Sequence, residues 1–223
     1  MTPQSVELKL LRPTQIAVGM QLVKSKRKGI RKLERRPAEL VEFILENPIR
    51  VIAGPASLFY IVDHHHLALA LLDEGFETAP VIVLGDLTKT PRAQFWDEMT
   101  AKGWVHPVDG EGVQRPISAI PNKVKNMEDD AYRSLAGFVR LKGGYLKSQT
   151  PFAEFLWADF YRSRITPKQL KRNFDKQIPV AMKLAATADA AKLPGYISKM
   201  DKKSGGAQKT EPKVKKRSQR SSD

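Results

Sequence analysis

Short apolar runs separated by turn residues indicate a β-hairpin followed by a helix and a further strand. The runs 49–53 and 58–62 are rich in β-branched, aromatic and aliphatic residues, and the Gly-Pro-Ala-Ser segment 54–57 between them is typical of a four-residue hairpin loop. Residues 67–72 have the Ala/Leu composition of a buried helix, and 79–84 form another apolar run. We expect a right-handed crossover from the second hairpin strand, through this helix, to the last strand.

One more strand and two more helices complete the pattern of the first half. Residues 6–11 have strand character, and apolar residues recur at helical spacing between Pro37 and Asn47. A Thr-Pro pair then opens a helix over 91–102, which a glycine ends. These elements predict a mixed sheet covered by helices.

The second half has the pattern of a helical extension. Residues 105–126 are rich in Gly, Pro and mixed polar residues, which indicates an irregular connector. Asp129 or Asp130 is placed to cap the next helix. Later helices open after Thr-Pro pairs, the first of them dense in aromatic residues that we assign to a core, and we expect the last stretch to break or kink at Pro179.

Taken together, the patterns predict an α+β fold whose strand and helix order is α/β-like. Residues 1–104 are expected to form a small mixed-sheet domain, and 105–200 a connector with an all-helical extension. Residues 201–223 contain Lys, Gly, Ser and Gln with almost nothing to bury, so we expect a disordered basic tail.

Charge points to a polyanionic partner. The net charge is +14, of which the segment from Lys202 to Asp223 contributes +6. A second basic cluster, at 24–36, contains eight Lys and Arg residues with Glu34 as its one acidic residue, and it belongs to the folded part. This cluster is the better candidate for a phosphate-facing surface, and a solvated basic loop is the alternative.

Two absences narrow the chemistry. The chain has no cysteine, which excludes disulfides, thiolate metal sites and thiol redox chemistry. It also has no apolar leader and no run of 18 apolar residues, so we expect a soluble, cytoplasmic protein without membrane association.

The candidate chemistry lies where the second hairpin strand meets the Ala/Leu helix. Asp63 is followed there by His64, His65 and His66. A helix start presents free N–H groups and the positive end of the dipole, which attract anions, and phosphate above all. An aspartate can cap such a start, and histidine can donate hydrogen bonds or transfer protons near neutral pH.

Other interpretations of the three histidines stay open. Consecutive helical residues lie about 100° apart around the axis, so at most two of these side chains can share one ligand. They can serve in capping and packing alone. A metal site ranks last, because helical ligands favour i, i+4 spacing and the chain offers no cysteine.

The segment from Tyr60 to Leu84, with its strand, aspartate, histidine-rich turn, helix and buried strand, resembles the ParB/sulfiredoxin superfamily and most closely its ParB-like nuclease group. Superfamily members place an Asp-Gly-x-His-Arg type of turn after a strand. Asp63 falls on the aspartate, His64 on the glycine and His66 on the histidine. Leu67 stands where the arginine is expected, which removes a bidentate phosphate clamp.

Similarity to the same group extends through 11–15, 18–20, 132–137 and 151–160, and so covers most of the chain up to about residue 164. The resemblance implies a ParB/sulfiredoxin-like fold for the first domain. It also implies one of the superfamily's functions: DNA partition with CTP hydrolysis, kinase activity on a small molecule, or nuclease activity. Sulfiredoxin chemistry needs a cysteine that this chain lacks.

We therefore expect a protein that binds nucleotide or nucleic-acid phosphate at the turn from Asp63 to His66, as a nuclease, NTPase or small-molecule kinase. Asp63, His65 and His66 are the candidate catalytic residues, with His64 as a phosphate ligand. The other phosphate ligands come from the basic cluster, namely Lys24, Lys26 and Arg27. Mg²⁺ would accompany a bound nucleotide, with no dedicated protein metal site. The alternative is a non-enzymatic DNA-binding or partition-type module that uses its tail and helical half, and no oligomeric state is predicted.

Overall fold

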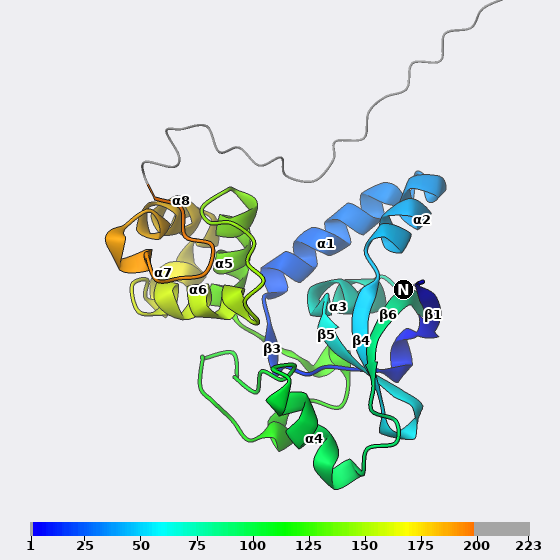
Figure 1. The fold of residues 1–223 in the computed structure, drawn as a ribbon. Coiled ribbons are helices and arrows are strands. Elements are labelled where there is room, and N and C mark those ends of the chain that lie inside the picture. The colour runs from blue at the N-terminus through cyan, green and yellow to red at the C-terminus, as the bar shows by residue number, and fades with distance from the viewer. Residues whose placement is uncertain (1, 199–223) are drawn as a thin grey trace, which may run out of the picture.

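The computed structural model describes residues 2–198, and it confirms an α+β fold with a helical C-terminal part (Figure 1). The five strands of the main sheet lie in the order β1-β6-β4-β5-β2. They are β1 (Gln4–Glu7), β2 (Leu11–Arg12), β4 (Ile49–Gly54), β5 (Leu58–Asp63) and β6 (Thr78–Asp86). The central strand β4 pairs antiparallel with β5 and parallel with β6, so the sheet is mixed.

Helices cover both faces of this sheet. On one face lie α1 (Met20–Leu33), α2 (Pro37–Glu46) and α3 (His65–Asp73), which enclose a core with the inward side chains of β4 and β5. On the other face, α4 (Arg92–Ala101) packs Phe95 and Met99 against Ile52. Consecutive residues of β4, such as Val51 and Ile52, face opposite sides of the sheet and are both fully buried, which is why residues 51–53 form a continuous apolar run.

The helical part has its own core. It contains α5 (Ala131–Leu141), α6 (Ala153–Arg162), α7 (Pro167–Arg172) and α8 (Phe174–Ala185). Trp157 and Tyr161 of α6 are fully buried there, which confirms that the aromatic residues of this helix form a core. Asp130 caps α5 by accepting hydrogen bonds from the N–H groups of Tyr132 and Arg133.

The two parts meet at α1. Its Gly19 cap lies so close to α5 that an added Cβ would be 2.6 Å from the backbone nitrogen of Ser134. Just before it, β3 (Ala17–Val18) pairs with β7 (Glu128–Asp129) at the start of α5. In Figure 1, α1 extends from the junction with α5 across α3 to α2.

Several local predictions are confirmed. The β4–β5 hairpin forms with a short 3-10 turn at Pro55–Ser57, and the predicted helix before it is α2. Between the two halves, residues 105–126 form mostly irregular structure with two short 3-10 turns, Ile117–Ala119 and Val124–Asn126. The described residues contain no helix long and apolar enough to cross a membrane.

Three expectations are wrong. The strands on either side of α3 run antiparallel to each other, because β5 is antiparallel and β6 parallel to β4, so no right-handed crossover joins them. The last helical stretch breaks at Asn173, whose side chain caps α8, and not at Pro179, which lies inside that helix; a kink at Pro179 stays a prediction. The strand expected over 6–11 is not continuous, because Leu8–Leu10 forms a 3-10 helix between β1 and β2. The basic cluster is largely helical in α1, so the alternative of a solvated loop is excluded.

The sequence pattern did not indicate helix α1, and the structure shows why. Leu22, Val23 and Ile30 are its buried residues, which leaves the apolar face too sparse to stand out in the sequence. Arg27 occupies a position between them and faces α3 through an ion pair instead of an apolar contact.

The division at residues 104 and 200 stays a prediction, and the tail expected at 201–223 lies outside the described residues.

Candidate functional site

The turn between β5 and α3 is built around a left-handed residue. His64, which occupies the place of the motif glycine, has φ 72° and ψ 27°. Asp63 Oδ1 accepts the His64 N–H at 2.7 Å and no N–H group in the first turn of α3, so the helix cap expected of Asp63 is not formed. The His64 ring is anchored by Nδ1, which donates to the Pro48 carbonyl at 2.9 Å.

The next two histidines face inward and accept hydrogen bonds from backbone. The N–H of Thr14 donates to His65 Nε2 at 3.3 Å, and the N–H of Gly19 donates to His66 Nε2 at 3.0 Å. Both acceptors require a neutral ring with its proton on Nδ1. These bonds attach the segment that leads into α1 to the start of α3.

Burial sets the protonation of all three rings. It lowers the pKa of His65 to about 3 and that of His66 well below 6.5. Burial also lowers the pKa of His64, an effect that the nearby Asp63 carboxylate opposes. All three imidazoles are therefore neutral at pH 7, while Asp63 keeps a side chain that is 45% exposed and lies 3.4 Å from Arg50.

The structure separates the three predicted basic ligands. The charge of Lys26 lowers the pKa of His64 and of His66, which places it near the turn. Arg27 lies at the opposite end of α3, where it forms ion pairs with Asp73 at 3.1 Å and Glu74 at 2.5 Å. Lys24 lies on the outer surface of α1.

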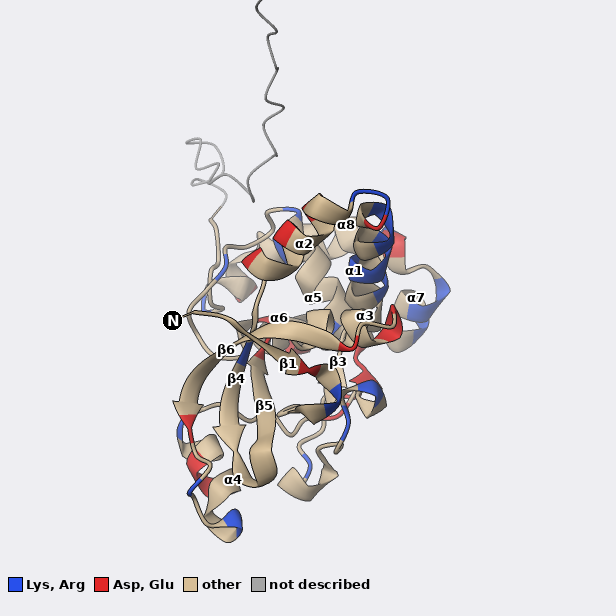
Figure 2. Cartoon of the chain, turned by 90° about the vertical axis from the view of Figure 1, so that its right-hand side faces the viewer, with Lys and Arg blue, Asp and Glu red and all other residues tan. Residues whose placement is uncertain are grey.

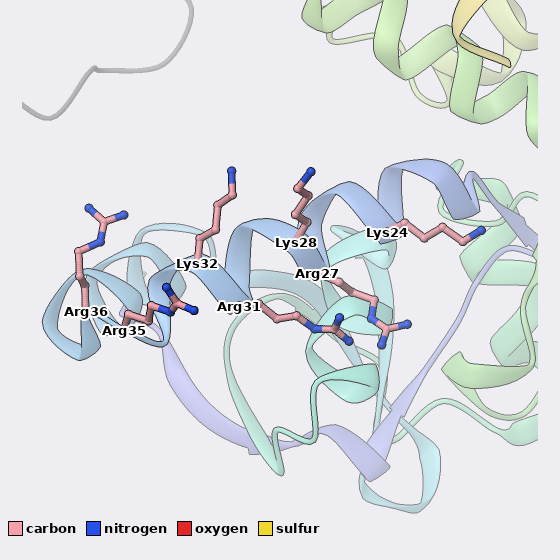
Figure 3. Close-up of a pocket in the computed structure, with 7 residues that line it drawn as sticks. All are labelled: Lys24, Arg27, Lys28, Arg31, Lys32, Arg35 and Arg36. Carbon is pink, nitrogen blue, oxygen red and sulfur yellow. The ribbon is translucent and has the colours of Figure 1, made fainter.

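That outer surface forms a basic groove of about 780 Å³ on α1 and the start of α2 (Figure 3). It is lined by Lys24, Arg27, Lys28, Arg31, Lys32, Arg35 and Arg36. Figure 2 shows the same concentration of Lys and Arg along α1. No carboxylate of residues 2–198 forms an ion pair with Lys24, Lys28, Lys32 or Arg35.

We call Lys24, Lys28 and Lys32 the lysine row. They are four residues apart, so successive members are about 6 Å apart along the helix axis and share one face. Arg27 and Arg31 point away from this face, toward α3, where both bind Glu74 (Figure 3). The lysine row, together with Arg35, therefore carries the positive charge of the groove that forms no ion pair within the described chain.

Arg133 and Arg50 are neighbours of the histidine turn that sequence reasoning missed. Arg133 is on α5, and its charge lowers the pKa of His65 and of His66. Its side chain is 12% exposed and lies 3.6 Å from Glu154. Arg133 falls within the 132–137 segment that supports the family resemblance, but no spacing in the sequence relates it to residues 64–66.

The described residues contain no group of three or more His, Asp or Glu side chains arranged to hold a metal ion. A divalent ion at the turn would therefore take most of its ligands from phosphate and water, with Asp63 as the nearest exposed carboxylate. Arg50 beside it would compete for the same oxygen.

Comparison with known proteins relates this chain to one sequence family and to solved structures. A family model described as "Putative ParB-like nuclease" matches residues 4–163. The crystal structure of protein Atu1540 from Agrobacterium tumefaciens is similar, with a TM-score of 0.80 and 38% identity over 89% of this chain and 99% of that chain. A conserved hypothetical protein from Pyrococcus furiosus has a TM-score of 0.30 and 15% identity, over 41% of this chain and 34% of that chain, and this match is too weak to establish a common fold. No curated protein gives a significant match.

Proposed function

Because the chain belongs to the ParB-like nuclease family, we propose that it binds nucleic acid, and that the phosphate backbone lies along the lysine row of α1. The family supports a role that involves nucleic acid. The observation that carries the proposal is the row itself, three exposed lysines at regular spacing without an ion pair in the described chain.

Electrostatics favours a polymer over a single phosphate at this surface. The groove is long and open, and its charges lie along a helix rather than around one point (Figure 3). Lysines that neutralise successive phosphates release condensed counterions, and this supplies most of the affinity for nucleic acid of any sequence. The contribution of the lysine row should therefore be strong at low salt and independent of sequence.

Phosphodiester or nucleotide hydrolysis is a second candidate function, favoured by the half-exposed carboxylate of Asp63. In this candidate, Asp63 would hold a Mg²⁺ ion together with substrate phosphates, and the ion would supply the activation of water. His65 and His66 then keep the region folded, because their Nε2 atoms already accept backbone hydrogen bonds and both rings are neutral. Their role as acid or base stays a prediction.

The test of the binding proposal is a salt titration with matched variants. Fluorescence anisotropy would measure the affinity for a labelled oligonucleotide between about 50 and 200 mM salt, the range over which phosphate contacts weaken strongly. Replacing the lysine row by Gln removes three charges. The slope of log affinity against log salt should then become shallower by about 2 to 3, since each lost phosphate contact contributes 0.7 to 0.9.

A matched control removes three charges from the opposite end of the molecule. Lys89, Arg92 and Lys102 are exposed and lie in or beside α4, far from α1 in Figure 1. Their replacement by Gln should leave the slope nearly unchanged. Equal losses in the two triple variants would show that net charge alone drives binding and would refute the proposed surface. Removing residues 204–223 tests the alternative in which the basic tail provides the affinity.

A further inference from the structure

A second hollow, of about 680 Å³, lies where the first turn of α1 meets the helical part. Its apolar wall includes Tyr132, Leu170 and Phe174, from three different helices. Gln21, Glu111 and Asp129 supply polar groups around this wall. Ligand sites commonly combine an apolar wall with a few polar groups in a hollow of this size.

The charge of this cleft makes it unsuitable for phosphate. The guanidinium group of Arg162 is already bound to the buried Asp130 at 2.9 Å and to Asp159 at 3.3 Å. It also lies 4.8 Å from the centre of the Tyr132 ring. The lining also contains the carboxylates of Glu111 and Asp129 and one further cation, the exposed Lys171. Because Arg162 is already paired, the carboxylates outnumber the remaining cation, which disfavours an anion. A neutral, flat group with hydrogen-bond donors fits these surroundings better.

The polar groups match the edges of particular bases. A carboxylate accepts hydrogen bonds from an exocyclic amino group, and a glutamine amide can bond adenine through two atoms. Asp129 uses Oδ1 for the N–H of Met20, which leaves further acceptor sites on the carboxylate. Adenine, cytosine and guanine carry an exocyclic amino group, whereas thymine and uracil do not.

The cleft and the basic groove both include residues of α1. Gln21 lines the cleft and Lys24, three residues later, lines the groove, so the two are separated by about 4.5 Å along the axis of α1. Figure 3 shows Lys24 at the end of the row. A strand whose phosphates follow the lysine row would thus bring a neighbouring base to the cleft.

We infer that this cleft binds an unpaired base of the strand that lies along α1, with a preference for bases that carry an exocyclic amino group, such as adenine and cytosine, over thymine. The inference rests on the proposed function and adds the class of substrate, which is single-stranded or locally unpaired nucleic acid. A base inside a duplex cannot enter a hollow of this kind without leaving the stack, and unpaired bases stack readily on aromatic side chains.

The experiment compares oligonucleotides of equal length in single-stranded oligo-dA, oligo-dC and oligo-dT and in duplex form. We expect single strands to bind more tightly than duplex, and dA or dC to bind several-fold more tightly than dT. Gln21→Ala and Glu111→Gln should each bring the ratio of the affinities for dA or dC and for dT closer to one. Neither variant should change the slope of log affinity against log salt. The triple lysine-row variant should lower the affinity for every oligonucleotide and keep the preference.

These outcomes separate the two proposals. Affinity that depends on the lysine row but is equal for all bases and for duplex would overturn the cleft inference and leave the proposed function standing. Adenosine and cytidine, which lack phosphate, test the cleft without the row. Each should shift the NMR amide signals of Gln21 and Leu170 at millimolar concentration more than thymidine does, and equal or absent shifts would overturn the inference.

Discussion

The backbone N–H of Gly19 donates a 3.0 Å hydrogen bond to Nε2 of His66, and this bond fixes the start of α1 against the start of α3. The lysine row begins five residues after Gly19 on the same helix. The orientation of the proposed binding surface therefore depends on a histidine that does not touch it.

Removal of this acceptor should destabilise the fold. His66→Leu introduces an apolar side chain that cannot accept a hydrogen bond, so it leaves the buried Gly19 N–H without a partner. The loss of this partner costs about 1 to 3 kcal/mol. His66→Gln, which supplies an amide oxygen, should recover part of that loss. Urea unfolding of both variants checks this, and equal stability of the Leu variant and the native protein would show that the bond is unimportant.

Acid should destabilise the protein through His65. Its folded-state pKa is about 3, against an ordinary value of 6.5, so the unfolded chain takes up the proton first. The contribution of the neutral ring is complete above pH 6.5 and is lost as the pH falls toward 3, by at most about 1.4 kcal/mol per pH unit.

Denaturant unfolding between pH 7.5 and pH 4 measures this dependence. His65→Gln removes the titrating group and keeps an acceptor for Thr14, so its stability should fall less steeply with acid. Identical pH slopes for the native protein and this variant would contradict a buried neutral His65.

Arg27 and Lys28 are neighbours with opposite expected roles. Arg27 is held by Asp73 and Glu74, whereas Lys28 belongs to the lysine row. Arg27→Gln should therefore lower the free energy of unfolding more than Lys28→Gln does, by about 1 kcal/mol for a partly exposed pair. Lys28→Gln should lower the affinity for nucleic acid more than Arg27→Gln does.

Paired thermal and anisotropy measurements on these two variants provide a control for charge, since each removes one positive charge from the same helix. The account would be wrong if Arg27→Gln weakened binding more while leaving stability unchanged.

Hydrolysis, the second candidate function, predicts a specific loss of activity. Incubation of the full chain with labelled DNA, RNA and nucleoside triphosphates, with and without Mg²⁺, would reveal cleavage or phosphate release. Asp63→Asn should abolish either activity and preserve binding to the lysine row, because Asp63 is not part of the groove. Turnover that persists in Asp63→Asn would remove this carboxylate from the reaction.

Local sequence patterns predicted much of the fold. The hairpin β4–β5, helix α2 and the Asp130 cap each depend on residues close together in the chain, so turn chemistry and periodicity were sufficient. Helix α1 was not predicted, because Arg27 interrupts an already sparse apolar face.

The contacts around the histidine turn were harder to predict than the helices and strands. Thr14 and His65 are 51 residues apart, and Gly19 and His66 are 47 apart, so their hydrogen bonds arise only from tertiary packing. The same applies to Arg133, which α5 brings to the histidine turn. The sequence identified the aspartate and the histidines as candidate residues. The inward direction of the His65 and His66 rings could not be predicted, because it depends on the segment 14–19 that packs against them.

Lysine footprinting tests the central claim most directly. Acetylation of the exposed lysines, read by mass spectrometry with and without a bound oligonucleotide, reports which amines contact phosphate. We predict that Lys24, Lys28 and Lys32 become protected, while Lys89 and Lys102 react at the same rate in both states. If nucleic acid binds and the three lysines of α1 remain as reactive as in the free protein, the phosphate backbone does not lie along this helix.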